Sequence, residues 1–214
     1  MFEFIPERRV LVIPNIYFDD LEHITNKEGR FILKESDERL PNGETLKAAE
    51  HNFDFRQLIP YGILVDIEKK KILAYRKTKE SNEKRLHGFW SIGVGGHVEP
   101  CDGEGWDAVE NAFKREMKEE LGVEPIVTIG DKYIYSDETE VDQVHLGIAR
   151  IVTRYEGVLR PSREIPDWEW CSINELQQRK LETWSVECLN WIIENWGDLL
   201  DCSEKDPATS GEYR

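Results

Sequence analysis

The chain has 214 residues, of which 28 are Lys or Arg and 43 are Asp or Glu, giving a formal net charge of −15 at pH 7. This acidic balance argues against permanent binding to DNA or RNA, because such binding needs a basic face. No apolar run approaches the roughly 20 residues of a membrane-spanning helix, and the acidic N-terminus does not resemble a secretory leader. We expect a cytoplasmic protein that binds neither polymeric nucleic acid nor membranes, with its four scattered cysteines reduced.

The first part of the chain has weak signals for regular structure. Residues 8–16 contain a short β-branched apolar run that can form a strand, but residues 19–56 are polar and aperiodic. We therefore interpret residues 1–55 as an N-terminal extension packed on the domain that follows. Clear strand signals begin at residues 57–65 and return at 72–76, and the charged turn between them predicts a β-hairpin.

A third strand is expected at residues 89–94, directly before Gly95 and Gly96. The stretch 104–121 then has helical periodicity, with large apolar residues on one face, and Gly122 follows as a helix stop. The residues of that apolar face are Trp106, Val109, Phe113, Met117 and Leu121. The pattern predicts a central amphipathic helix that follows a glycine-rich loop.

The C-terminal part alternates strand and helix signals. Strands are expected at 126–129 and 144–153, a further segment at 168–172 leads into a short helix, and an amphipathic helix covers 183–197. Strands on both sides of a central helix predict an α/β (α+β) domain over residues 56–200, with a mixed sheet between helices. The polar residues 201–214 are expected to form a disordered tail.

Three carboxylates gather near the end of the central helix. Glu116, Glu119 and Glu120 stand at positions i, i+3 and i+4, so they are neighbours on one helical surface at the flank of the apolar stripe. Carboxylates this close repel one another, and at least one should show a raised pKa. A hard divalent cation with oxygen ligands would relieve that repulsion, although a solvated acidic face is the other interpretation of the three residues alone.

The context of these carboxylates resembles a known sequence motif. Residues 115–123 read Arg-Glu-Met-Lys-Glu-Glu-Leu-Gly-Val, which matches every specified position in the second half of the Nudix box. Gly95-Gly96-His97-Val98-Glu99-Pro100 is similar to the usual opening of the box loop. Segment 72–76 resembles the strand before the box, and segment 170–176 resembles the family's late Trp-to-Glu-Leu segment. The resemblance covers about residues 57–180.

The first half of the box departs from the pattern. After the five residues that follow Gly96, the chain has Asp102 in place of the usual Glu, and twelve residues instead of seven separate Asp102 from Arg115. An insertion of about five residues around positions 103–106 reconciles the two halves of the motif.

The resemblance implies a Nudix-like α/β/α sandwich and a pyrophosphohydrolase, an enzyme that cleaves a nucleoside diphosphate linked to another moiety by attack of water on phosphorus. Glu116, Glu119, Glu120 and the Gly95 carbonyl would bind Mg²⁺ or Mn²⁺. Arg115 would orient a glutamate through a charge-assisted hydrogen bond. The substrate would be a small nucleotide, and the protein could form a homodimer, as members of the family often do.

The resemblance leaves the general base open. In some members it is a box glutamate, here Glu119 or Glu120, and in others it is a carboxylate of a later loop. The late candidates are Glu164 and Glu169, followed by Glu140 and Asp142. Candidates for phosphate binding are Arg76, Arg85 and His97, which lie close to the glycine pair in sequence.

Two other functions share the fold. A catalytically inactive nucleotide-sensing module would keep the fold, but such proteins usually lose the glutamate pair, which is intact here. An isomerase of the isopentenyl-diphosphate type would need a cysteine at the strand end beside a histidine. This chain has Gly95-Gly96-His97 there, and Cys101 comes only later in the loop.

Overall fold

The computed structural model describes residues 9–15, 29–34, 48–77, 86–137 and 140–204, without the side chains of residue 33 and residues 201–204. Its strands are β1 (Arg9–Pro14), β2 (Arg30–Leu33), β3 (Phe55–Asp66), β4 (Lys71–Arg76), β5 (Trp90–Ser91), β6 (Val94–Gly95), β7 (Val123–Ile134), β8 (His145–Gly157) and β9 (Trp168–Cys171). Its α-helices are α1 (Gly105–Leu121), α2 (Ile173–Gln177), α3 (Thr183–Glu194) and α4 (Trp196–Glu204), and its 3-10 turns are η2 (Ala49–His51), η4 (Pro100–Asp102) and η5 (Asp142–Val144).

The chain divides into two compact units. Unit 1 comprises Met1–Tyr61, Gly95–Arg115 and Tyr133–Ile148, and unit 2 comprises Gly62–Val94, Glu116–Lys132 and Ala149–Arg214. Four long elements, namely β3, α1, β7 and β8, therefore contribute residues to both units. Among the strand pairs, β8 pairs with β3 and β7, and β6 pairs with β3.

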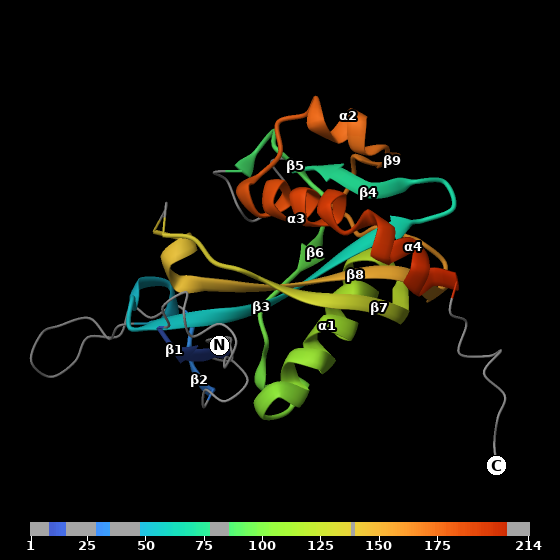
Figure 1. Cartoon of the computed structure of the whole chain (residues 1–214). Helices are drawn as coiled ribbons and strands as arrows, with labels where there is room; N and C mark the ends of the chain where they lie inside the picture. Colours follow the sequence, from blue (N-terminus) through green and yellow to red (C-terminus); the bar gives the residue numbers. More distant parts are fainter. Residues whose placement is uncertain (1–8, 16–28, 35–47, 78–85, 138–139, 205–214) are drawn as a thin grey trace, which may run out of the picture. The chain divides into compact units, whose positions relative to one another are not determined.

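Unit 1 is built on β1, which pairs antiparallel with β2 and with the start of β3 (Figure 1). Alternate residues of β1 point to opposite faces of the strands. Leu11 and Ile13 join a buried cluster with Ala108 and Val109 of α1, whereas Val10 and Val12 pack with Ala49 of η2 and its neighbours. The first half of α1 is amphipathic, and its apolar face packs into this cluster.

Unit 2 contains the hairpin of β3 and β4, with Val65 opposite Ile72, and places β5 and β9 on either side of β4. Buried Glu182, directly before α3, fastens β5: Ser91 Oγ donates to its carboxylate, and Lys77 Nζ lies 2.9 Å from it. The hydroxyl of Ser185 in α3 accepts a hydrogen bond from the backbone N–H of Ile92 at 3.0 Å. These contacts attach the start of α3 to β5.

The mixed α/β fold expected from the sequence is confirmed, and several boundaries differ. The strand expected at 89–94 is interrupted at Ile92 and Gly93, β7 and β8 are longer than predicted, and β2 and η2 fall in a stretch interpreted as loop. Helix 183–197 ends at Glu194, and α4 follows through Glu204 into the segment assigned to the tail. Residues 205–214 lie outside the described part of the chain.

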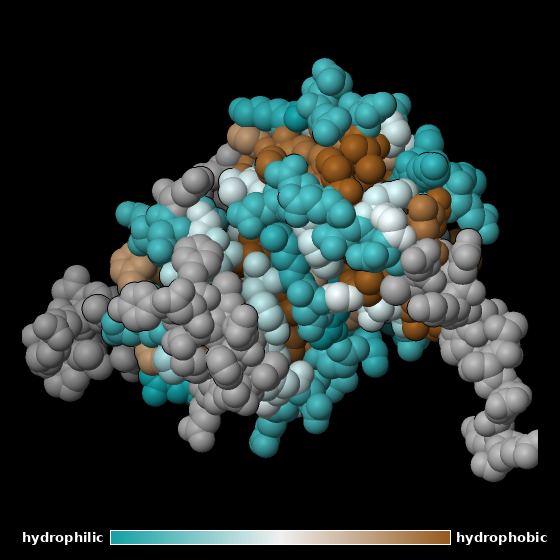
Figure 2. All heavy atoms as spheres, in the orientation of Figure 1, coloured by the Kyte–Doolittle hydropathy of each residue, from teal (hydrophilic) through white to brown (hydrophobic). Residues whose placement is uncertain are grey.

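The surface mixes polar and apolar areas. Hydrophilic residues spread over much of the face drawn in Figure 2, and apolar residues show in patches between them.

Within the described ranges, no helix is long and apolar enough to cross a membrane. Cys101, Cys171 and Cys188 are free thiols, and burial raises the pKa of Cys188.

Candidate active site

The three box glutamates lie on the last part of α1, in unit 2. Their helix positions follow from the buried stripe beside them, because Met117 and Leu121 are fully buried and fix the rotation of the helix. Glu116 and Glu120 are half-buried and Glu119 is exposed. The helix ends at Leu121, and the following Gly122 has a φ of +73° and donates its N–H to the carbonyl of Lys118.

The loop of residues 160–165 is fastened to this end of α1. The backbone N–H groups of Arg160 and Ser162 donate to the carbonyls of Leu121 and Glu120, both at 2.8 Å, so the loop satisfies acceptors that the helix end leaves open. The Ser162 hydroxyl also donates to Glu120 Oε2 at 2.7 Å and accepts from the N–H of Glu164 at 3.2 Å. Glu120 and Glu164 are thus held by the same serine.

The pKa of Glu120 is raised. Desolvation by burial is the largest cause, and the charges of Glu164 and Glu119 add to it, whereas the hydrogen bond from Ser162 lowers the pKa. The predicted crowding of carboxylates is therefore present at Glu120, and its charged neighbours include Glu164 from the late loop.

Arg115 lies in unit 1 and pairs with Asp102. Its Nε lies 2.8 Å from Oδ1, its Nη2 lies 3.0 Å from Oδ2, and a further bond runs from Nη2 to the carbonyl of His97 at 2.9 Å. The Asp102 side chain is only 3% exposed and also accepts the N–H of Glu99. In the sequence Asp102 is an ambiguous position of the box, whereas the structure gives it a defined partner.

This pair also locates the five extra residues of the loop. Since Asp102 follows Gly96 at the usual spacing and contacts Arg115, the additional residues lie between Asp102 and Arg115. Gly103 and Gly105, both with positive φ, make the turn into α1, and Trp106 packs on the core of unit 1. The insertion lengthens the segment between η4 and the helix, and the contact between Asp102 and Arg115 is still formed.

The glycine loop is closely packed at Gly95. A Cβ atom on this residue would lie 2.2 Å from the carbonyl oxygen of Pro60, so no side chain fits there. The carbonyl of Gly93, two residues earlier, accepts hydrogen bonds from the hydroxyls of Tyr75 and Ser91 at 3.1 and 3.0 Å. These bonds fix the interruption between β5 and β6 that leads into the loop.

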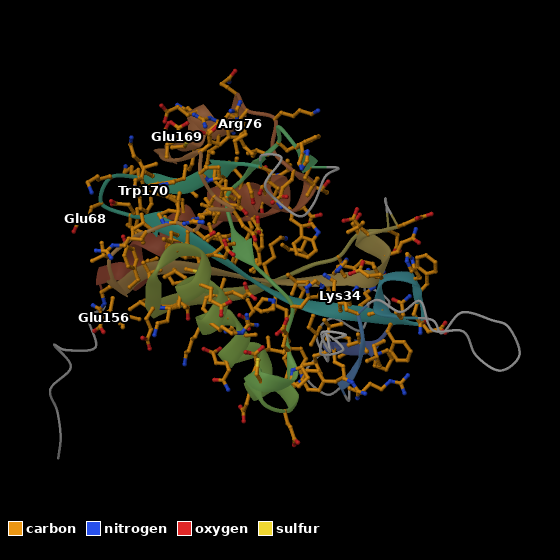
Figure 3. The ribbon with its side chains drawn as sticks, turned by 180° about the vertical axis from the view of Figure 1, so that it is seen from behind. Lys34, Glu68, Arg76, Glu156, Glu169 and Trp170 are labelled. Carbon is orange, nitrogen blue, oxygen red and sulfur yellow. The ribbon has the colours of Figure 1, made fainter. Side chains whose placement is uncertain are left out.

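The candidates for phosphate binding have different surroundings. Arg76 and Asp167 form an exposed ion pair at 2.7 Å. Glu169, a candidate base, lies on the strand next to that of Arg76 (Figure 3) and pairs with Arg179 at 2.8 Å. Arg85 lies outside the described residues.

His97 belongs to a second cluster that the sequence patterns do not predict. Its ring centroid is 5.7 Å from that of His145, and ligand atoms of Glu50, His97 and His145 lie within 4.8 Å of one another. Burial lowers the pKa of His145. His145 stands out in the sequence as a single histidine in the apolar segment 144–153. The sequence around Glu50 contains no pattern that predicts a metal ligand.

The comparison with known families decides the classification. The NUDIX domain model matches residues 58–192. The chain belongs to the Nudix family. Protein YmaB of Bacillus subtilis (strain 168) is 31% identical to this chain over 150 residues, covering 64% of this chain and 71% of the relative.

Solved structures agree on the fold. The candidate Nudix hydrolase Tm1382 superposes with a TM-score of 0.62 at 24% identity, covering 87% of this Nudix chain and 98% of the other. The NUDIX domain of Shewanella oneidensis NrtR, crystallised with ADP ribose, gives a TM-score of 0.51 at 14% identity, covering 66% and 88%. At these identities the similarity establishes the fold alone.

Proposed function

We propose that this Nudix protein is a Mg²⁺- or Mn²⁺-dependent pyrophosphohydrolase that cleaves a nucleoside diphosphate linked to another group. The observation that carries the proposal is the arrangement at the end of α1. An intact set of box glutamates is present there, and a serine of the late loop holds both Glu120 and the segment of Glu164.

The residues of α1 suit a hard divalent cation. Glu116, Glu119 and Glu120 offer only oxygen atoms, the ligands that Mg²⁺ and Mn²⁺ prefer. The pKa of Glu120 is raised first by burial and then by the charges of Glu164 and Glu119, and a bound cation would favour the ionised carboxylate. We assign these glutamates and the Gly95 carbonyl as its ligands. When bound, such an ion neutralises charge on the diphosphate and acidifies the attacking water.

The remaining residues would position the substrate and move a proton. Hydrolysis forms a bond from the water oxygen to one phosphorus and breaks the bond from that phosphorus to the bridging oxygen. We place the water proton on Glu164, with Glu119 and Glu120 as the alternative acceptors. Arg115, which pairs with Asp102, would orient a box glutamate through a charge-assisted hydrogen bond. Arg76, Arg85 and His97 are the proposed contacts to phosphate.

The test is turnover by the full-length protein on a panel of nucleotides. The panel contains nucleoside triphosphates, ADP-ribose, diadenosine polyphosphates, NADH and sugar nucleotides, each assayed with Mg²⁺, with Mn²⁺ and with EDTA. We expect hydrolysis of at least one compound that EDTA abolishes. Metal binding without turnover across the panel would contradict hydrolysis of these compounds and favour the sensing module.

Variants separate the roles of the carboxylates. Glu120→Gln should lower kcat by at least about 100-fold, and Glu164→Gln should lower kcat and remove the acid limb of the pH–rate profile if Glu164 is the base. Glu124→Gln, an exposed glutamate just after α1, is the matched control and should keep wild-type turnover. Unchanged turnover in Glu120→Gln would refute the assignment of the metal ligands.

A further inference from the structure

Unit 1 contains a cluster of potential metal ligands that is separate in sequence from the glutamates of α1. Glu50 is in η2, His97 follows β6, and His145 is the first residue of β8. Each offers one ligand atom, and the three atoms lie within 4.8 Å of one another. Donors bound at about 2.1 Å to one tetrahedral zinc ion are about 3.4 Å apart, so the three atoms would approach one another by up to about 1.4 Å when an ion binds.

The imidazole of His145 is oriented for ligation. Its Nδ1 lies 2.7 Å from the carbonyl oxygen of Val141, and because a carbonyl only accepts, Nδ1 carries the hydrogen. The lone pair is therefore on Nε2, the arrangement found in histidine ligands whose second nitrogen is held by a backbone carbonyl. The ring of His97 approaches it at an interplanar angle of 58°, and its Nε2 is buried.

The backbones of the cluster residues are fixed by polar contacts. Fully buried Arg56 donates to the carbonyl of His145 at 3.1 Å, while its own charge is paired with Asp137 at 2.6 Å. Arg115 donates to the carbonyl of His97. A rigid support of this kind holds ligand geometry before an ion binds.

The carboxylate of Glu50 lies at the outer limit of ion-pair distance from a lysine ammonium group. Lys34, labelled in Figure 3, lies 3.8 Å from Glu50 Oε1, and its carbonyl accepts the N–H of Glu50. Both side chains are largely buried, at 19% and 23% exposed. A bound cation would compete with this ammonium for the carboxylate.

A buried amide lies on the same side of β3 as η2. Gln57 stands opposite Val12 and shares a face with Phe55, and both of those residues pack with Ala49, which precedes Glu50. Within the described part of the chain, neither amide atom of Gln57 has a hydrogen-bond partner, although the side chain is buried. A buried amide without partners is unfavourable, so we expect it to meet water or a ligand.

We propose that Glu50, His97 and His145 bind a divalent transition-metal ion of the Zn²⁺ class. Two imidazoles and one carboxylate are the ligand set of open zinc sites, in which a fourth position takes water or a substrate oxygen. Imidazole nitrogen also selects Zn²⁺ over Mg²⁺, so this site differs in chemistry from the oxygen-only glutamates of α1. His97 would then be a metal ligand, and any action of His97 on a phosphate would pass through the ion.

The test measures Zn²⁺ binding by the full-length protein in excess Mg²⁺, which occupies oxygen-only sites. Equilibrium dialysis should give one Zn²⁺ per chain, and Co²⁺ in its place should give the visible absorption of a four-coordinate site. His97→Gln and His145→Gln should each weaken Zn²⁺ binding by more than about 100-fold. The absence of Zn²⁺ binding by the wild-type protein, which needs no variant, would overturn the proposal.

Controls exclude other ligands. His51→Gln, in the exposed residue next to Glu50, Cys101→Ser, in an exposed thiol, and Glu120→Gln, in the box, should all keep Zn²⁺ affinity. Equal loss of binding in any of these would place the ion elsewhere. Lys34→Met keeps all three ligands and removes the competing ammonium, so this variant should bind Zn²⁺ more tightly than the wild type. Unchanged or weaker binding would count against Glu50 as a ligand.

Discussion

At the scale of single residues, the proposed metal ligand Glu120 lowers the stability of the metal-free protein at neutral pH. Its carboxylate is partly desolvated and stands beside Glu119 and Glu164, and its pKa is raised as a result. A raised pKa in the folded state favours the protonated form. The contribution to stability is therefore complete below the unfolded pKa of about 4.5 and is lost as the pH rises through the folded pKa.

Glu120→Gln should consequently raise the melting temperature of the metal-free protein at neutral pH, because glutamine keeps the shape and hydrogen-bonding oxygen without the charge. The difference from wild type should shrink as the pH falls towards 4.5 and vanish below it. Added Mg²⁺ should stabilise the wild type more than the variant. Thermal melts over a pH series check this, with Glu124→Gln as the control, and a variant less stable than wild type at neutral pH would contradict it.

At the scale of elements, the pair of Asp102 and Arg115 joins η4 to α1. The aspartate is buried, uses both oxygens on Arg115 and accepts one backbone N–H. Charge-assisted bonds of this kind contribute more than neutral ones, and their loss leaves buried groups unsatisfied.

Asp102→Asn should lower the free energy of unfolding by about 1.5–3 kcal/mol, since one bond to a charged partner is lost or weakened. Asp102→Glu restores the charge and is the residue that the box pattern has at this position, so it should recover most of the stability. Urea unfolding of the three proteins provides the measurement. A loss below about 0.5 kcal/mol in Asp102→Asn would show that the ion pair contributes little.

The sequence predicts elements well where the pattern is local. The stripe of residues 106–121 identifies α1 because every apolar position repeats at helical spacing. By contrast, β2 has only four residues and becomes a strand through its pairing with β1. The interruption between β5 and β6 at Gly93 depends on hydrogen bonds from the hydroxyls of Tyr75 and Ser91. Such elements are set by tertiary contacts that no short window contains.

The same distinction applies to the site. The spacing of Glu116, Glu119 and Glu120 on one helix is local, so the sequence alone predicts that they are neighbours. The attachment of Glu120 to Ser162 joins residues 42 positions apart, and the cluster of Glu50, His97 and His145 draws on three separate segments. Neither could be predicted without the fold.

At the scale of the whole molecule, the segment before residue 58 lies outside the matched family region but contributes to a core. The four central residues of β1 are buried, and Leu11 donates its N–H to the carbonyl of Val98, just beyond the glycine loop. The extension is thus part of the structure that supports the loop.

Ile13→Ala should destabilise the protein by about 2–5 kcal/mol, because Ile13 is 1% exposed in the cluster that includes α1. Val158→Ala, at a residue 62% exposed, should change the free energy of unfolding by less than about 0.5 kcal/mol. Denaturant titration checks both. A small effect of Ile13→Ala would mean that β1 is dispensable for folding.

The contact of Gly95 with Pro60 also limits how this protein could evolve or be redesigned. Isomerase chemistry on this fold uses a cysteine at the strand end beside a histidine, and His97 is already in place. Yet the first atom of any side chain on Gly95 would collide with a backbone carbonyl, which a change of rotamer cannot relieve. A cysteine therefore cannot replace Gly95 by a single substitution in this backbone. Conversion to isomerase chemistry would first require the backbone of β3 to move at Pro60.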